Sequence, residues 1–83
     1  MIVHIMFKGG PYDGQLYSLP LKWPQDQVRI AHKDAIKADT QEVSVDLYQV
    51  IESSKFMPTH IQAAYRWVGS KLSNTHLVDL WVE

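Results

Sequence analysis

The side chains of this chain that are suited to acid–base or nucleophilic chemistry are its histidines and serines. No histidine has a second metal-type ligand four residues away, which is the spacing of a helix-borne metal site. Ser73 alone has a histidine, His76, within four residues, and no serine lies in the strained G-x-S-x-G context of an activated nucleophile. Isolated residues of these types are typical of hydrogen-bonded structural positions, so we expect no catalytic residue and no metal site. The histidines are His4, His32, His60 and His76.

The absence of cysteine excludes a further set of mechanisms. Without a thiol there is no cysteine nucleophile, no thiolate ligand for zinc and no redox pair, and we expect no cofactor. One arrangement stays open as an alternative. If the two terminal segments are neighbouring strands, His4, His76 and Asp79 would come together as a metal-ligand cluster or as a base with its orienting partner.

The segment Gly9–Gly14 contains three of the four glycines of the chain, together with a proline. Proline pre-sets φ for a turn and Asp-Gly suits a positive φ, while the flanking residues 2–7 and 15–19 have strand-like character. The segment matches neither the G-x-x-x-x-G-K-[ST] nor the G-x-G-x-x-G pattern of phosphate-binding loops. We therefore predict a β-hairpin. Its structural turn is formed by Gly9, Gly10, Pro11, Asp13 and Gly14.

Large apolar side chains in loop-like stretches are the candidates for binding a partner. Trp23 is flanked by prolines, and Phe56 and Met57 precede another proline. Such side chains either fold back onto the core or stay exposed as interface anchors, and both alternatives are open here. Arg66 stands between two aromatic residues, where it could stack or reach a partner carboxylate. The candidate partner-binding residues are Trp23, Phe56, Met57, Tyr65 and Arg66.

Period-2 alternation of apolar residues predicts the strands that position these side chains. Residues 2–7 and 77–82 are largely apolar on both faces, which is typical of central strands, so the two ends of the chain are expected together in the middle of a sheet. Residues 61–68 alternate as in a half-buried strand that ends at Gly69-Ser70. Residues 28–31 predict a short strand.

The stretch 40–54 fits two templates. Val43, Val45 and Leu47 alternate as in a strand, but Val43, Leu47, Val50 and Ile51 also make a helical stripe with Thr40 as N-cap. Valine, isoleucine and tyrosine favour a pleated surface, so we favour the strand. The expected fold is mainly β and forms one domain over residues 1–83. We expect a small antiparallel sheet or a partly open barrel of about five to six strands, with room for one short helix within 40–54 or 33–39.

Composition and charge limit the kinds of partner. Apolar residues make up 46% of the chain and charged residues 20%, which is a globular balance. A net charge of −1 gives no positive electrostatic field that would attract a phosphate backbone, so we expect no nucleic-acid partner. No apolar run approaches the ~20 residues that span a bilayer, and no basic leader precedes the first strand, so we expect a cytoplasmic protein without a membrane partner. Domains of this size often rely on self-association, and a homo-oligomer stays open.

The N-terminal pattern resembles that of small proteins of tailed bacteriophages and prophages. These proteins carry a Gly-Gly-Pro-x-Asp-Gly hairpin, here Gly9–Gly14, and a downstream Tyr-Arg pair, here Tyr65-Arg66. Tyr12 departs from the pattern, because a small residue is more frequent at that position. The resemblance covers the N-terminal hairpin and the pair, and it implies a phage origin.

The resemblance leaves three kinds of role open. A non-enzymatic protein would bind a host or phage protein in the host cytoplasm and inhibit or redirect a host or defence protein. A virion accessory protein would decorate the capsid or join head and tail. A small-ligand binder or small enzyme would need a pocket, and a chain of this size leaves little room for one of about 300 Å³ or more. We favour the first role.

Overall fold

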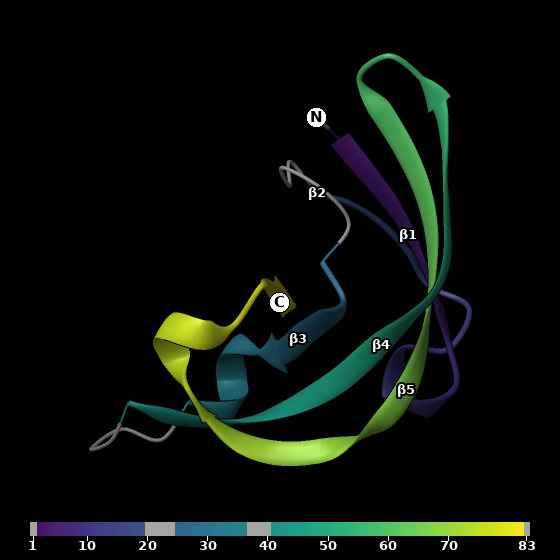
Figure 1. The fold of residues 1–83 in the computed structure, drawn as a ribbon. Coiled ribbons are helices and arrows are strands. Elements are labelled where there is room, and N and C mark those ends of the chain that lie inside the picture. The colour runs from purple at the N-terminus through teal and green to yellow at the C-terminus, as the bar shows by residue number, and fades with distance from the viewer. Residues whose placement is uncertain (1, 20–24, 37–40, 83) are drawn as a thin grey trace.

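The computed structural model describes residues 2–19, 25–36 and 41–82, although nothing is described of the Phe56 side chain. These residues form one six-stranded sheet (Figure 1). The strands are β1 (Ile2–Lys8), β2 (Leu16–Leu19), β3 (Gln27–His32), β4 (Glu42–Met57), β5 (His60–Asn74) and β6 (Leu80–Val82). Three short 3-10 turns join them, namely η1 (Gly10–Tyr12), η2 (Lys33–Ala35) and η3 (Thr75–Leu77).

The strands lie in the order β2-β1-β5-β4-β3-β6. The β1/β2, β3/β4 and β4/β5 pairs are antiparallel, while β1/β5 and β3/β6 are parallel, so the sheet is mixed. Figure 1 shows it curled into a half-barrel, and the prediction of a mainly β, partly open barrel is confirmed. The stretch 42–57 is strand, so the helical alternative is wrong there, and within 33–36 the chain makes only the 3-10 turn η2.

The β4–β5 hairpin runs through both halves of the sheet. Residues 60–66 of β5 pair with β1, and residues 46–49 of β4 pair with β3. Register shifts at Leu47/Tyr48, Val50/Glu52 and Lys55/Met57 mark bulges, which bend and twist a strand pair. The expected end of a strand at Gly69-Ser70 is wrong. Gly69, with φ 143°, lies at the first of these bulges, and β5 continues beyond it to Asn74.

The main core fills the inside of the curl. Period-2 alternation turns Val3, Ile5 and Phe7 of β1 inward, and none of the three is exposed to solvent. Each fully buried side chain of this size stabilises the fold by about 1.5–3 kcal/mol. The same cluster contains Tyr12, Val28, Ile30, Tyr48, Ile61, Ala63 and Tyr65.

The two ends of the chain are not neighbours in the middle of the sheet, as the sequence predicted. β1 lies between β2 and β5, whereas β6 is an edge strand beside β3. The curl explains why the last segment is apolar on both faces. Leu80 and Val82 pack against the main core, while Trp81 packs against a second cluster formed by Ala31, Val43 and Val45. An edge strand is thus covered on both sides without being central.

The predicted hairpin between β1 and β2 is present. All three of its glycines have positive φ, and Gly14 N–H donates to the carbonyl oxygen of Phe7 at 2.8 Å. The carboxylate of Asp13 accepts from Gly9 N–H at 2.6 Å. Tyr12 turns into the core from this connection, so the turn also supplies a core side chain.

Candidate binding site

The outward-facing side chains of β2, β1 and the first part of β5 form a continuous surface. Directly opposed residues share a face of the sheet, so Leu16 lies beside Met6, and Ser18 beside His4. The parallel ladder adds Gln62 beside His4, and Ile2 beside His60. Met57 joins them because it is opposite His60 at the tip of the β4–β5 hairpin. We call this surface the outer patch; it consists of Ile2, His4, Met6, Leu16, Ser18, Met57, His60 and Gln62.

Exposed apolar side chains surround a hollow in the outer patch. Leu16 is 70% exposed, Met57 51% and Met6 42%. The hollow has a volume of about 530 Å³, and His4, Ser18, His60 and Gln62 also line it. The expectation that a chain of this size leaves little room for a pocket of about 300 Å³ is therefore wrong. The arrangement therefore combines an apolar rim with a polar centre.

The polar centre is a chain of hydrogen bonds across three strands. Ser18 Oγ lies 2.8 Å from His4 Nδ1, and His4 Nε2 lies 2.9 Å from His60 Nδ1. The two imidazole planes are nearly parallel at 8°, with centroids 5.1 Å apart. Two rings stacked face to face would be separated by the van der Waals distance of about 3.5–4.0 Å. His4 Nε2 and His60 Nδ1 are only 2.9 Å apart, so the two rings meet edge to edge. This is the geometry of an N–H···N hydrogen bond.

The order serine, histidine, histidine is also that of a nucleophile, a base and an orienting group. Acyl transfer needs, in addition, hydrogen-bond donors about 3 Å from the developing oxyanion. Of the residues that line the hollow with Ser18, Met6, Leu16 and Met57 have side chains that supply no such donor, whereas the Gln62 amide carries N–H groups.

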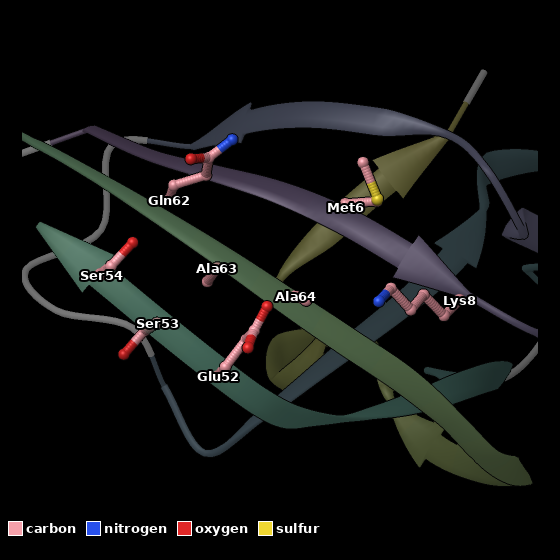
Figure 2. Close-up of a pocket in the computed structure, with 8 residues that line it drawn as sticks. All are labelled: Met6, Lys8, Glu52, Ser53, Ser54, Gln62, Ala63 and Ala64. Carbon is pink, nitrogen blue, oxygen red and sulfur yellow. The ribbon is translucent and has the colours of Figure 1, made fainter. Parts of the chain in front are cut away.

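A second, more polar hollow of about 320 Å³ adjoins the first, and Met6 and Gln62 line both. Figure 2 shows Lys8 from β1 and Glu52 from β4 on opposite sides of Ala64. Two of the residues that line this second hollow, Ala63 and Ala64, have small side chains, which leave its volume open.

Charge is distributed unevenly over the sheet. β1, β2 and β5 contain no aspartate or glutamate, although the chain as a whole has a net charge of −1. Their fixed charges are all positive and belong to Lys8, Arg66 and Lys71. Lys8 and Arg66 are register neighbours on the outer face. The carboxylates of the central strands lie on β4, at Glu42, Asp46 and Glu52.

The residues proposed from the sequence as partner contacts have different positions. Trp23 lies outside the described residues, and only the backbone of Phe56 is described. Met57 belongs to the outer patch, and Arg66 is exposed farther along the same face. Tyr65 is fully buried and its hydroxyl donates to the carbonyl oxygen of Gln25, so it serves the core rather than a contact surface.

The alternative cluster of His4, His76 and Asp79 is wrong. His76 lies in η3, and the carboxylate of Asp79 accepts from the backbone N–H of Arg29 at 2.9 Å. His4 is instead hydrogen-bonded to His60. The error follows from the expected pairing of the terminal strands, since β6 lies beside β3 and not beside β1.

Sequence reasoning missed most of the outer patch, although a signal was present. In β1, Met6 is out of phase with the buried residues at positions 3, 5 and 7, and in β2, Leu16 is out of phase with Tyr17 and Leu19. A large apolar residue at the outward position of a strand marks a surface to be covered. The pairing of His4 with His60 had no local signal, because 56 positions separate the two histidines.

Within the described ranges, no group of three or more histidine, aspartate or glutamate side chains is placed to hold a metal ion. The same residues include no helix of the length and apolarity needed to cross a membrane. Comparisons with protein families, with curated proteins and with solved structures find no match to this chain.

Proposed function

We propose that this protein acts by binding another protein through the outer patch, and not by catalysis. The observation that carries the proposal is the ring of exposed Leu16, Met57 and Met6 side chains around the larger hollow. Exposed apolar side chains around a concave surface are typical of interface anchors. Covering each of them would contribute about 1.5–3 kcal/mol to binding before the cost of association is subtracted.

The kind of partner follows from the resemblance of the N-terminal hairpin to phage proteins. We propose that the protein is phage-encoded and that it inhibits or redirects a host or defence protein in the host cytoplasm. Gly9, Gly10 and Gly14 of this hairpin all have positive φ, the backbone conformation for which glycine is the default residue. A virion accessory role is distinguished by mass spectrometry of purified particles, in which an accessory protein would be present in stoichiometric amounts.

The proposal is tested by reversing the polarity of the patch. Leu16→Glu places a charge on an edge strand at a 70% exposed position, so it should leave folding intact. Binding to a partner captured from host lysate should weaken by about 2 kcal/mol, which is about thirtyfold in Kd. Leu72→Glu is the matched control, because Leu72 is 58% exposed on the part of β5 beyond the patch. Equal binding by the two variants, both with parental melting curves, would contradict the proposal.

A further inference from the structure

We propose that the partner segment on the outer patch carries a carboxylate among apolar side chains, and that this carboxylate docks beside the His4–His60 pair. The inference rests on the proposed function and specifies the chemistry of the partner. It is carried by three features of the surface: its charge, its histidine pair and its apolar rim.

Charge complementarity selects an acidic segment. The three adjacent strands that supply every residue of the outer patch except Met57 contain no carboxylate, while Lys8 and Arg66 lie side by side at the end of the same face. Glu52 of β4, opposite Ala64, is a carboxylate that lines the adjoining hollow with Lys8. An anion that approaches this face therefore meets fixed positive charges and two imidazoles. Opposed charge patterns of this kind steer encounter and exclude partners of the wrong sign.

The histidine pair can accept a proton without losing its hydrogen bond. A bond between two imidazoles needs one N–H donor and one ring nitrogen with a lone pair, so it survives when one ring is protonated and the other is neutral. It is lost when both rings are protonated, because two N–H groups then face each other. The geometry of the pair therefore accommodates one positive charge at the centre of the patch, and a docked carboxylate would favour that charge.

Imidazole is the side chain whose ordinary charge change lies nearest to physiological pH. The charged side chains on this face of the neighbouring strands include Lys8 on β1, Arg66 on β5 and Glu52 on β4. β2 contributes Leu16 and Ser18, and neither side chain is charged. Lys55 on β4 is opposite Ile61 and so belongs to the other face. Binding of a carboxylate here should therefore be linked to proton uptake.

Because the rim of the hollow is apolar, the partner's carboxylate must be accompanied by apolar side chains. Met6, Leu16 and Met57 border the hollow that His4 and His60 line, so a carboxylate beside the histidines has apolar side chains around it. A segment with leucine, glutamate and leucine at every second position has the required spacing, because every second side chain of an extended strand points the same way.

The test uses three labelled pentapeptides, acetyl-Leu-Ser-Glu-Ser-Leu-amide and its counterparts with glutamine or lysine in place of glutamate, with Kd measured by fluorescence polarisation at pH 6 and pH 8. The C-terminal amide leaves the glutamate side chain as the carboxylate under test. The glutamate peptide should bind about fivefold tighter at pH 6, since linked equilibria of this kind differ by that factor or more. Its glutamate stays ionised at pH 6, so the peptide does not cause the change. The glutamine peptide should show no pH dependence, and the lysine peptide should bind most weakly.

The double variant His4→Gln/His60→Gln should remove the pH dependence, because either imidazole alone can still take up a proton, and its melting curve shows whether it is folded. His76→Gln is the matched control, because His76 is an exposed histidine in η3, outside the patch. The inference is overturned if no peptide binds, if the lysine peptide binds as tightly as the glutamate peptide, or if the pH dependence survives in the folded double variant. If glutamine and glutamate peptides bind alike and Leu16→Glu weakens both, the binding surface stands and the acidic partner is wrong.

Discussion

Tyr12, Tyr48 and Tyr65 connect the core to loop segments that do not pair with a strand. Tyr48 OH donates to the carbonyl oxygen of Gly9 at 2.7 Å and accepts from Tyr12 N–H at 3.1 Å, so it anchors the first hairpin. Tyr65 OH donates to the carbonyl oxygen of Gln25 and anchors the chain just before β3. Burial raises the pKa of each of these tyrosines, because it disfavours the charged phenolate.

The pKa of Tyr65 predicts a loss of stability at alkaline pH. Burial, with smaller contributions from Asp26 and Asp79, raises this pKa to about 12 from its ordinary value of 10.0. The unfolded chain therefore loses the Tyr65 proton first. The stabilisation is complete below pH 10 and disappears as pH rises through about 12. The urea midpoint should fall over this window, and Tyr65→Phe should make the fall shallower.

The matched control for this titration is Tyr17→Phe. Tyr17 is half-buried on β2 and its hydroxyl donates to the side-chain oxygen of Gln15 at 2.6 Å. This variant should keep the parental pH profile. A Tyr65→Phe profile identical to the parent would show that Tyr65 does not cause the alkaline loss.

At the scale of single elements, the first hairpin depends on its glycines for two different reasons. A Cβ on Gly10 would lie 2.4 Å from Cγ of Trp67, at a φ of 66°. A Cβ on Gly14 would meet nothing within 4 Å, so at that position the φ of 80° is the only obstacle. Left-handed backbone costs a non-glycine residue about 1–2 kcal/mol.

Gly14→Val should therefore lower the melting temperature through backbone strain, and Gly10→Ala should lower it further because Trp67 must also move. Thermal unfolding followed by circular dichroism measures both effects. A Gly10→Ala protein that melts above Gly14→Ala would show that the contact with Trp67 does not constrain the turn. A Gly14→Val protein with the parental melting curve but without partner binding would show that the turn itself is a binding element.

The elements that the sequence predicted are those with local signals. Glycine and proline marked the hairpin before β2, and alternating valines marked β4. The order of the strands had no such signal. β1 pairs in parallel with β5, whose first residue lies 52 positions beyond the end of β1, and only the curl shows why β6 is apolar on both faces. Of the binding surface, Met57 was identified from its neighbour Pro58, whereas Met6 and Leu16 needed the register to be known.

At the scale of the whole molecule, the half-barrel leaves apolar surface uncovered. Its radius of gyration is 12.9 Å, against about 12 Å for an average compact chain of this length, and its extents are 43 × 23 × 20 Å. Among the described residues, ten large hydrophobic side chains are exposed. A sheet that is curled but not closed buries its inner face and leaves the outer face exposed.

The two halves of the molecule differ in what they present to a partner. The half with β1 and β2 combines Leu16, Met6 and Met57 with the histidine pair and a hollow. The other half exposes Trp67 and Leu72, but Trp67 already donates its indole N–H to Asp46 at 3.3 Å and packs on Gly10. This contrast is the reason why we propose the outer patch, and not the other half, as the binding surface.

Hydroxyl-radical footprinting of the protein, free and bound to its captured partner, tests this assignment most directly, because two of the three patch anchors are methionines, which oxidise readily. We predict that Met6 and Met57 are protected in the complex, while oxidation of Trp67, which is 41% exposed outside the patch, is unchanged. Equal oxidation of Met6 and Met57 in the free and bound protein would contradict the account.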